Sequence, residues 1–274
     1  MMSNIHQRHD LQYLDLIEYV IKCGVWKENR TGVRTKSVFG QQMRFDLSDG
    51  TIPLLTTKKM HTKSIIHELL WYLMGTGNIK YLHDNGVRIW NEWADDNGEL
   101  RRVYGVQWRH WMGPNNIETD QIAVLVDTLK NNPNDRRMMV SAWNVGELDQ
   151  MALPPCHYLF QCYVANNKLS MILNQRSCDV GLGIPFNIVQ YSLLLRMLAE
   201  VTNLEPGELI WNGGDVHIYE NHIHLLAEQV HREAYHSPTF KFTRKVTDID
   251  DFKFEDFLIE GYQSHPSIKM DVAV

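Results

Sequence analysis

The stretch MALPPCHYLFQCYV, Met151–Val164, places a cysteine between a Pro-Pro pair and a strongly β-like run. Pro154 and Pro155 each fix φ and lack a backbone donor, so the approach to Cys156 is stiff. Apolar side chains follow Cys156 on both sides of an alternating pattern, which predicts a strand covered on both faces. Cys156 is then either a nucleophile at the rigid start of a strand or a small buried side chain. The segment alone favours the buried side chain, because unpaired cysteine is among the most buried residue types.

The composition is that of a folded globular protein with a slight excess of acid. The protein has 274 residues, 44% of them hydrophobic, and a formal net charge of -6. Its tryptophans and tyrosines argue against disorder, and its charge argues against nonspecific coating of nucleic acid. The four cysteines, Cys23, Cys156, Cys162 and Cys178, form no CxxC pair and no zinc-like spacing. The first ten residues lack the apolar core of a signal peptide, and no apolar run approaches membrane-spanning length. We therefore expect a soluble, cytoplasmic protein with reduced thiols.

Residues 1–274 are predicted to form one domain, because the sequence has no repeat, low-complexity tract or Gly/Ser linker. Apolar stripes and end signals predict helices at Asp10–Cys23, at Ser64–Met74, after Asp120, from Pro185, and at about Tyr219–Arg232. Strands are predicted at Val38–Asp46, Arg137–Trp143, His157–Val164, Lys168–Gln175 and Glu208–Trp211. These elements show no strict βαβ rhythm, so we expect an α+β fold with helices packed on a mixed sheet. The segments Asn91–Arg102 and Trp108–Glu118 are the expected insertions.

Three motifs resemble known ligand sites but lack an essential part. The run HELLW, His67–Trp71, begins like the HExxH helix of zinc proteases, but its fifth residue is not a ligand. Histidines and a glutamate cluster within His222–His231, but no third ligand falls at the spacing that a metal site needs. The run Gly181–Gly183 lacks the third glycine of a dinucleotide loop. We therefore expect no metal site.

Glu68 is the first polar residue that packing does not explain. It lies in a predicted helix whose neighbours are nearly all apolar, where a carboxylate is costly unless it is paired, hydrogen-bonded or protonated. A raised pKa would suit a proton shuttle. A buried structural carboxylate is the alternative.

Arginines at the ends of predicted strands form the second such feature. Arg136 and Arg137 precede one strand, and Arg176-Ser177 follows another. Guanidinium groups match phosphate, so the pattern is consistent with a phosphomonoester ligand, although a single arginine at a strand end is usually solvated. An arginine beside Cys156 would also lower the pKa of its thiol and favour the thiolate.

Asn187, in GIPFNIVQYS, is the third feature. An asparagine early in a helix is commonly a cap. Its side-chain amide also offers one donor and one acceptor, which complement the O4 and N3–H edge of uracil, whereas cytosine presents an amino donor and an N3 acceptor there.

Longer runs identify a family. ALPPCHYLFQCYV is followed by QRSCDVGLGIPFNIVQYSLL, GGDVHIYENH and a terminal DVAV. Upstream lie NRTGVRTKSVFGQQMRFDL, TTKKMHTKSIIHELLWYLMGTGNIKYLH, IWNEWADDNGEL, VYGVQWR and RRMMVSAWNVGELDQMALPPCH. Over essentially its whole length, the sequence resembles thymidylate synthase. The resemblance implies that family's single-domain α+β fold, in which one face of the mixed sheet forms a homodimer interface and helices cover the other.

The resemblance, rather than composition or periodicity, also implies the reaction. The enzyme would convert dUMP to dTMP, with 5,10-methylenetetrahydrofolate giving both the one-carbon unit and the hydride and leaving as dihydrofolate. Cys156 matches the nucleophile that adds to C6 of the uracil. The other residues that match catalytic positions are Glu68, Tyr104, His157, Arg176, Asp179 and Asn187.

The same matching implies the binding residues. For dUMP these are Arg30, Gln175, Arg176, Ser177, Asp179, Asn187, His217 and Tyr219, with Arg136 and Arg137 reaching the phosphate of the neighbouring subunit. For folate they are Lys58, His61, Ile89, Trp90, Trp93, Leu153, Asp179, Leu182, Gly183, Phe186 and Ala273. The terminal DVAV would close over the site and exclude water. The resemblance implies no metal and no membrane partner.

A neighbouring chemistry stays open. If water replaces hydride, the product is hydroxymethyl-dUMP, and pyrimidine hydroxymethylases share this fold. Asn187 speaks against a dCMP hydroxymethylase, whose matching residue is typically aspartate. Two departures keep a dUMP hydroxymethylase as the alternative: Arg101-Arg102 replaces the usual Gly-Pro before VYG, and Gly181 stands where many relatives carry a bulkier residue. Some members of the family also bind their own messenger RNA, which here would need a local patch around Arg136 and Arg137.

Overall fold

A six-stranded mixed sheet forms the centre of the protein. The structure is a computed structural model, and it describes residues 8–272. The strand order is β1-β2-β8-β7-β6-β5, and each neighbouring pair is antiparallel except β7 and β8, which run parallel. The strands are β1 (Val25–Lys27), β2 (Thr35–Asp46), β5 (Met139–Ser141), β6 (His157–Ala165), β7 (Lys168–Asp179) and β8 (Glu205–Tyr219). This sheet and its helices confirm the predicted α+β class.

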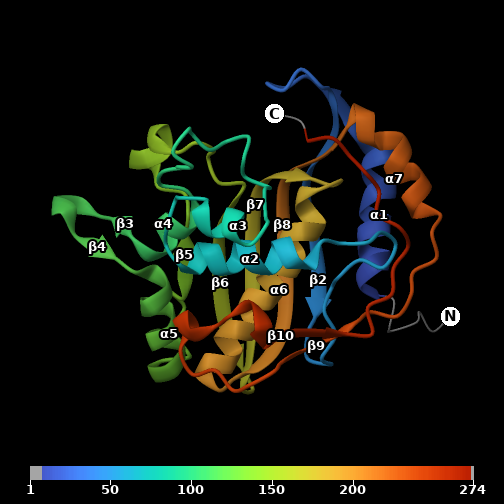
Figure 1. The fold of residues 1–274 in the computed structure, drawn as a ribbon. Coiled ribbons are helices and arrows are strands. Elements are labelled where there is room, and N and C mark those ends of the chain that lie inside the picture. Colours follow the sequence, from blue (N-terminus) through green and yellow to red (C-terminus); the bar gives the residue numbers. More distant parts are fainter. Residues whose placement is uncertain (1–7, 273–274) are drawn as a thin grey trace.

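Helices α6 (Gly183–Thr202) and α2 (Thr62–Leu73) lie over one face of the sheet (Figure 1). α6 packs on β7 and β8, and α2 packs on α6. Both helices are buried almost all round; most of their side chains are apolar, and several polar ones are buried with them. The other α-helices are α1 (Arg8–Cys23), α3 (Lys80–Asp84), α4 (Tyr104–Arg109), α5 (Gln121–Asn131) and α7 (Ile223–Val230). No helix within residues 8–272 is long and apolar enough to cross a membrane.

The opposite face of the sheet is exposed in the single subunit. A row of amides crosses three strands on this face: Gln42 Nε2 donates to Asn212 Oδ1 (2.9 Å), and Asn212 Nδ2 donates to Asn174 Oδ1 (3.2 Å). Large apolar side chains lie there as well, since Phe39 is 89% exposed and Tyr163 is 66% exposed. Exposed apolar area of this kind is unusual for the surface of a monomer unless it has a partner.

The strand directions bring three distant segments together at one end of the sheet. β6 begins where the antiparallel β7 ends, so His157 pairs with Gln175. β8 runs parallel to β7, so the last residues of both strands lie side by side, with Asp179 opposite His217. Parallel strands need a long crossover connection, and α6 supplies it. Strand pairing therefore gathers the candidate residues of β6, β7 and β8 at one end of the sheet.

The predicted elements are present with shifted ends. β8 is longer than Glu208–Trp211, because it pairs with β2 on one side and β7 on the other along its length. β5 is shorter than Arg137–Trp143, because only three of its residues pair with β6. The last predicted helix begins at Ile223 rather than near Tyr219, because Tyr219 still pairs with Thr35 in the sheet.

The sequence did not predict several short elements. These are β1, α3, α4, the pair β3 (Trp111–Met112) and β4 (Glu118–Thr119), and the pair β9 (Thr239–Phe242) and β10 (Phe257–Glu260). Each is too short to show a period of its own. The β3–β4 hairpin projects from the body (Figure 1), and it falls in one of the expected insertions.

Candidate active site

The backbone around Cys156 is fixed from both sides. The N–H of Cys156 donates to the hydroxyl of Tyr104 (2.9 Å), and its C=O accepts from the N–H of Arg176 (2.8 Å). The guanidinium of Arg176 donates to the carbonyls of Pro154 (2.9 Å) and Pro155 (3.0 Å). Cys156 itself is only partly buried. The interpretation that the segment alone favoured, a small side chain hidden in the core, is therefore wrong for Cys156.

Burial and charge act in opposite directions on the Cys156 thiol. Burial raises the pKa of this thiol above its ordinary value. The guanidinium of Arg176, hydrogen bonds from Ser177 and Tyr104, and the charge of Arg30 act to lower the same pKa. The arginine has the expected effect, but burial outweighs it.

Glu68 is a buried carboxylate that is hydrogen-bonded on both oxygens. Trp90 Nε1 donates to its Oε1 (2.6 Å), and Gln190 Nε2 donates to its Oε2 (2.7 Å). Tyr72 adds a further hydrogen bond. Burial nevertheless dominates and raises the pKa of Glu68 to about 7, so this group exchanges its proton near neutral pH.

His157 is buried and neutral. Its ring stacks on Tyr104 with 4.2 Å between ring centroids, and its Nδ1 lies 2.8 Å from the hydroxyl of Tyr191. Burial lowers the pKa of His157 to about 3, so the ring carries no charge at neutral pH. His157 therefore stacks on Tyr104 and hydrogen-bonds Tyr191 as a neutral ring rather than as a cationic acid.

A series of three side chains orients the amide of Asn187. The indole of Trp211 can only donate, and it donates to Gln175 Oε1 (2.9 Å). The other end of the Gln175 amide, Nε2, therefore faces Asn187 and donates to its Oδ1 (3.1 Å). The amide of Asn187 consequently has a defined direction, with one lone pair of Oδ1 used and its own N–H groups left to donate.

The residues predicted to bind the phosphate and the ribose also lie near the thiol. Arg176, Ser177 and Arg30 are among the groups whose charge or hydrogen bonds act on Cys156. At the end of β8, the rings of His217 and Tyr219 meet edge to face with 5.3 Å between centroids. The structure thus brings these predicted dUMP residues to one place.

The carboxylate of Asp215 contacts the ring of His217. Its Oδ1 lies 3.3 Å from Nδ1 of His217, Ser37 donates to the same oxygen (2.5 Å), and Lys27 forms an ion pair with the other oxygen. The hydrogen bonds of His217, Lys27 and Ser37 together hold the pKa of the Asp215 carboxyl well below its usual range.

Arg136 and Arg137 lie apart from this cluster, just before β5 at the edge of the sheet. The guanidinium of Arg137 binds Asp135 of the same subunit (2.8 Å) and is 88% exposed. The backbone carbonyl oxygen of Arg136 accepts from Gln161 in the middle of β6. Neither arginine is among the groups that act on the Cys156 thiol.

Aromatic and apolar residues border Glu68 and Tyr104 on the side predicted for folate. The ring of Trp90 meets Trp93 and Tyr104 edge to face, at 5.6 and 5.8 Å between centroids. Three further residues predicted for folate, Leu153, Leu182 and Phe186, are half-buried against the core. Ile89, also predicted for folate, is exposed. Gly183 begins α6, and Ala273 lies outside the described residues.

Lys58 and His61 occupy different environments. Lys58 is buried and donates to the C=O of Gly181 (2.5 Å), and burial lowers the pKa of its ammonium group to about 8. Asp179, the last residue of β7, accepts from the N–H of Gly181 (2.9 Å). His61 is exposed at the start of α2, with its Nδ1 2.8 Å from Ser64 Oγ.

The motifs set aside in the sequence hold no metal-binding geometry. Among residues 8–272, no group of three or more His, Cys, Asp or Glu side chains could hold a metal ion. His222 is buried and directs its Nε2 to the C=O of Asp271 (2.8 Å). His67 stacks on Phe254, with 4.5 Å between centroids, and contacts the hydroxyl of Tyr81.

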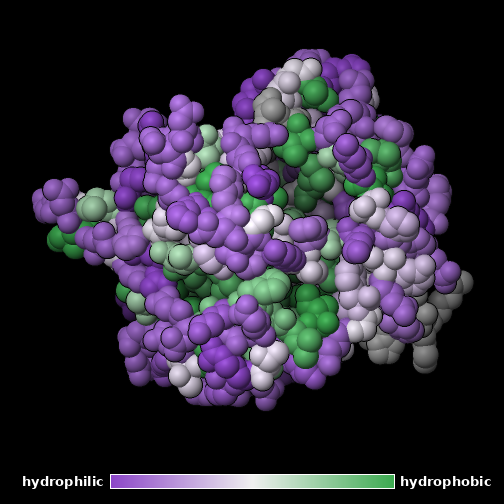
Figure 2. All heavy atoms as spheres, viewed as in Figure 1, coloured by the Kyte–Doolittle hydropathy of each residue, from purple (hydrophilic) through white to green (hydrophobic). Residues whose placement is uncertain are grey.

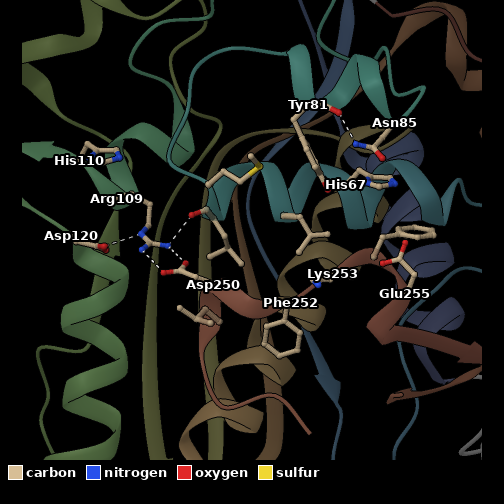
Figure 3. A pocket seen from close by; sticks show the side chains of 15 residues that line it. His67, Tyr81, Asn85, Arg109, His110, Asp120, Asp250, Phe252, Lys253 and Glu255 are labelled. Atoms are coloured by element: carbon tan, nitrogen blue, oxygen red, sulfur yellow. Dashed lines mark hydrogen bonds and ion pairs between the residues drawn. The ribbon is translucent and has the colours of Figure 1, made fainter. Parts of the chain in front are cut away.

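His67 also lines a separate cavity of about 560 Å³, and Glu68 is not among the residues that line it. Figure 2 shows hydrophobic residues recessed between hydrophilic rims below α2. In Figure 3, Arg109 lies between the carboxylates of Asp120 and Asp250, so the one arginine in this cavity is fully engaged. The cavity shares no lining residue with the cluster around Cys156.

Comparison with models of protein families gives one match. The model described as thymidylate synthase matches residues 11–274, which is nearly the whole sequence. The chain belongs to the thymidylate synthase family. Members of the thymidylate synthase family are folate-dependent methyltransferases of dTMP biosynthesis that use dUMP and methylenetetrahydrofolate.

Several residues that support the thymidylate synthase cluster were not expected from the sequence. They are Tyr72, Gln190, Tyr191, Trp211 and Asp215. The sequence does carry a signal for Gln190. It is a polar residue among apolar neighbours in the predicted helix, three positions after Asn187, and Glu68 stands out in its own helix in the same way. Trp211 gives no such signal, because its partner is on a different strand.

Arg101 and Arg102 replace the Gly-Pro that is usual in thymidylate synthases. Arg101 has a φ of 64°, in the left-handed region that favours glycine. Arg102 donates to Glu147 Oε2 (2.6 Å) and to the C=O of His110 (2.6 Å). Arg102 therefore ties α4, which carries Tyr104, to the segment that leads to Cys156.

The raised pKa of Glu68 predicts a pH-dependent cost to folding. The unfolded value is 4.5 and the folded value is about 7, so the native protein binds more protons than the unfolded state between these values. Stability due to protonated Glu68 is therefore present below pH 4.5 and is lost as the pH rises through about 7. In urea unfolding between pH 4.5 and 8, Glu68→Gln should gain stability relative to the natural protein as the pH rises. Replacing the exposed Glu228 by Gln should give a flat difference; a flat difference for Glu68→Gln would contradict the buried, shifted carboxylate.

Proposed function

We propose that the protein is a thymidylate synthase that methylates dUMP at C5 through a covalent bond between Cys156 and C6 of the base. One observation carries the proposal beyond membership of the family. A thiol fixed at the start of β6 lies beside Arg176 and Ser177 on one side, and on the other it joins, through Tyr104, the hydrogen-bonded cluster that contains Glu68. This arrangement supplies a nucleophile, an anion site and a proton carrier together.

The phosphate and the base of dUMP would meet different parts of this arrangement. Arg30, Arg176 and Ser177 offer the charge-assisted donors that a phosphate binds. The amide of Asn187, held by Gln175, would donate to O4 of uracil and accept from N3–H with its remaining lone pair. The aspartate typical of a dCMP hydroxymethylase would offer no donor to O4.

The chemical steps need Cys156 as a thiolate, which the charges of Arg176 and Arg30 favour and burial opposes. Sulfur of the Cys156 thiolate would bond to C6, the electrons of the C5–C6 double bond would move toward O4, and the donor of Asn187 would stabilise that oxygen. Glu68 would carry protons between bound water and the ring, since its pKa of about 7 allows both states. Bound methylenetetrahydrofolate supplies the one-carbon unit and the hydride. Trp90, Trp93, Leu153, Leu182 and Phe186 would exclude water from its side of the site.

The exposed face of the sheet supports a homodimer in which each site borrows arginines. A cavity of about 530 Å³ opens on this face beside Arg176, and it is lined by Phe39, Trp143 and Tyr158 among others. Arg136 and Arg137 of a partner could enter such a cavity, while in the single subunit Arg137 reaches only Asp135. A face that is both apolar and open is the surface that a symmetric partner would cover.

The products of one assay test the proposed reaction. Incubation with dUMP and methylenetetrahydrofolate should yield dTMP and dihydrofolate by mass spectrometry. Cys156→Ser should reduce turnover at least about 1,000-fold, because an alcohol is far less acidic than a thiol. Hydroxymethyl-dUMP with tetrahydrofolate would instead establish the hydroxymethylase, and substantial turnover by Cys156→Ser would remove this cysteine from the mechanism.

Asn187→Asp tests how the base is read. The carboxylate removes the donor to O4 and adds an acceptor for a cytosine amino group, so the kcat/KM preference for dUMP over dCMP should fall roughly 5- to 100-fold. Competition between the two nucleotides measures the ratio directly. An unchanged ratio would show that this amide does not read the base.

Mixing two inactive variants tests the shared site. Cys156→Ser keeps its arginines, and Arg136→Ala/Arg137→Ala keeps its cysteine, so a hybrid dimer would contain one intact site. Random reassembly of equal amounts should restore about a quarter of the natural activity, because half of the dimers are hybrids with one working site of two. Failure to recover activity in a mixture shown to contain hybrids would mean that the arginines act within their own subunit or not at all.

A further inference from the structure

The C-terminal segment is anchored just before its last residues. Residues 261–272 have no regular secondary structure, yet Met270 is 9% exposed and belongs to the hydrophobic core. The backbone carbonyl oxygen of Asp271 lies 2.8 Å from Nε2 of His222, which is 1% exposed. Beyond this point Val272 is 51% exposed. The anchor therefore ends where the terminal residues begin.

Gly181 leaves the space that Met270 fills. A Cβ built on Gly181 would lie 2.9 Å from Sδ of Met270 and 3.0 Å from Nδ1 of His222, closer than Cβ atoms are found in proteins or nearly so. The backbone of Gly181 is outside the left-handed region, so its φ does not require glycine. Space, not conformation, therefore limits this position, and a side chain here would displace Met270 or His222.

The loop that touches the tail also holds candidate ligand residues. The N–H of Gly181 donates to Asp179 Oδ1 (2.9 Å), and its C=O accepts from Lys58 (2.5 Å). The position built for a Cβ is 3.4 Å from the same Asp179 oxygen. A displacement of Gly181 by Met270 would therefore change the hydrogen bond between Gly181 and the Asp179 carboxylate.

His222 strengthens this connection through a hydrogen bond to the backbone of the tail. Its Nε2 faces a backbone carbonyl, so that nitrogen carries the proton and donates it. Within residues 8–272, the Nδ1 atom has no hydrogen-bonding partner and faces the same gap at Gly181. The contact thus depends on the shape of Met270 and on one hydrogen bond to the backbone.

We propose that Gly181, Met270 and His222 form a seat that sets the position of the C-terminal tail relative to the Asp179 loop, and so tunes the binding of the folate co-substrate. Gly181 and Met270 are positioning residues that act through Asp179 and the terminal residues. The proposal rests on the proposed function for its effect on folate, but the seat itself can be measured without turnover.

The test is a double-mutant cycle between Gly181→Ala and Met270→Ala. Gly181→Ala should displace the tail, raise the KM for methylenetetrahydrofolate roughly 5- to 100-fold and leave the KM for dUMP within about twofold. It should also speed the release of terminal residues by carboxypeptidase. In the double variant the alanine methyl gains the room left by the methionine, so both effects should be smaller than in Gly181→Ala alone.

Two controls isolate the seat. Gly146→Ala adds a methyl group where the nearest atom outside its sequence neighbours is 3.7 Å away, and Lys269→Ala changes an exposed residue beside Met270. Both should match the natural protein in KM and in carboxypeptidase release. Urea unfolding of every variant separates a displaced tail from a misfolded protein; if Gly181→Ala does not fold, the double variant must fold and release its tail no faster than Met270→Ala.

A Gly181→Ala protein with natural KM and tail release would overturn the proposal, as would effects in the double variant that equal or exceed those of Gly181→Ala alone. Absence of dTMP synthesis by the natural protein would instead refute the proposed function. The carboxypeptidase result would then still decide whether the seat exists.

Discussion

The parallel pairing of β7 with β8 is the constraint on which the site depends. Two parallel neighbours require a crossover, and here the crossover is α6, which carries Asn187 and Gln190 across the sheet. The same pairing places the ends of both strands beside the antiparallel start of β6. Cys156, Arg176 and Asn187 therefore meet because of one connection. If β7 and β8 were antiparallel, the last residues of the two strands would lie at opposite ends of the sheet.

Burial drives three ionisable groups of this cluster toward their neutral forms. It raises the pKa of the Cys156 thiol, raises that of Glu68 to about 7, and lowers that of His157 to about 3. The hydrogen bonds around Glu68 reduce this effect without reversing it. The charge that remains beside the thiol is mainly that of Arg176 and Arg30.

The sequence was most informative where a polar residue interrupts an apolar pattern. Glu68 and Asn187 were picked out in this way, and both make the buried hydrogen bonds that such positions need. The Pro-Pro-Cys run correctly indicated a rigid strand start but not the partial exposure of Cys156, because exposure depends on Tyr104 and Arg176, which come from other segments. The length of β8 and the roles of Trp211 and Asp215 were likewise inaccessible, since strand pairing rather than local pattern decides them.

The donor-only indole of Trp211 has a thermodynamic consequence for recognition. An amide that could rotate freely would present either its oxygen, an acceptor, or its NH2 group, a donor, in the same direction. Here the rotation is settled when the protein folds, because Gln175 can satisfy Trp211 in only one orientation. The entropy of fixing the orientation of the Asn187 amide is thus lost when the protein folds, rather than each time a ligand binds.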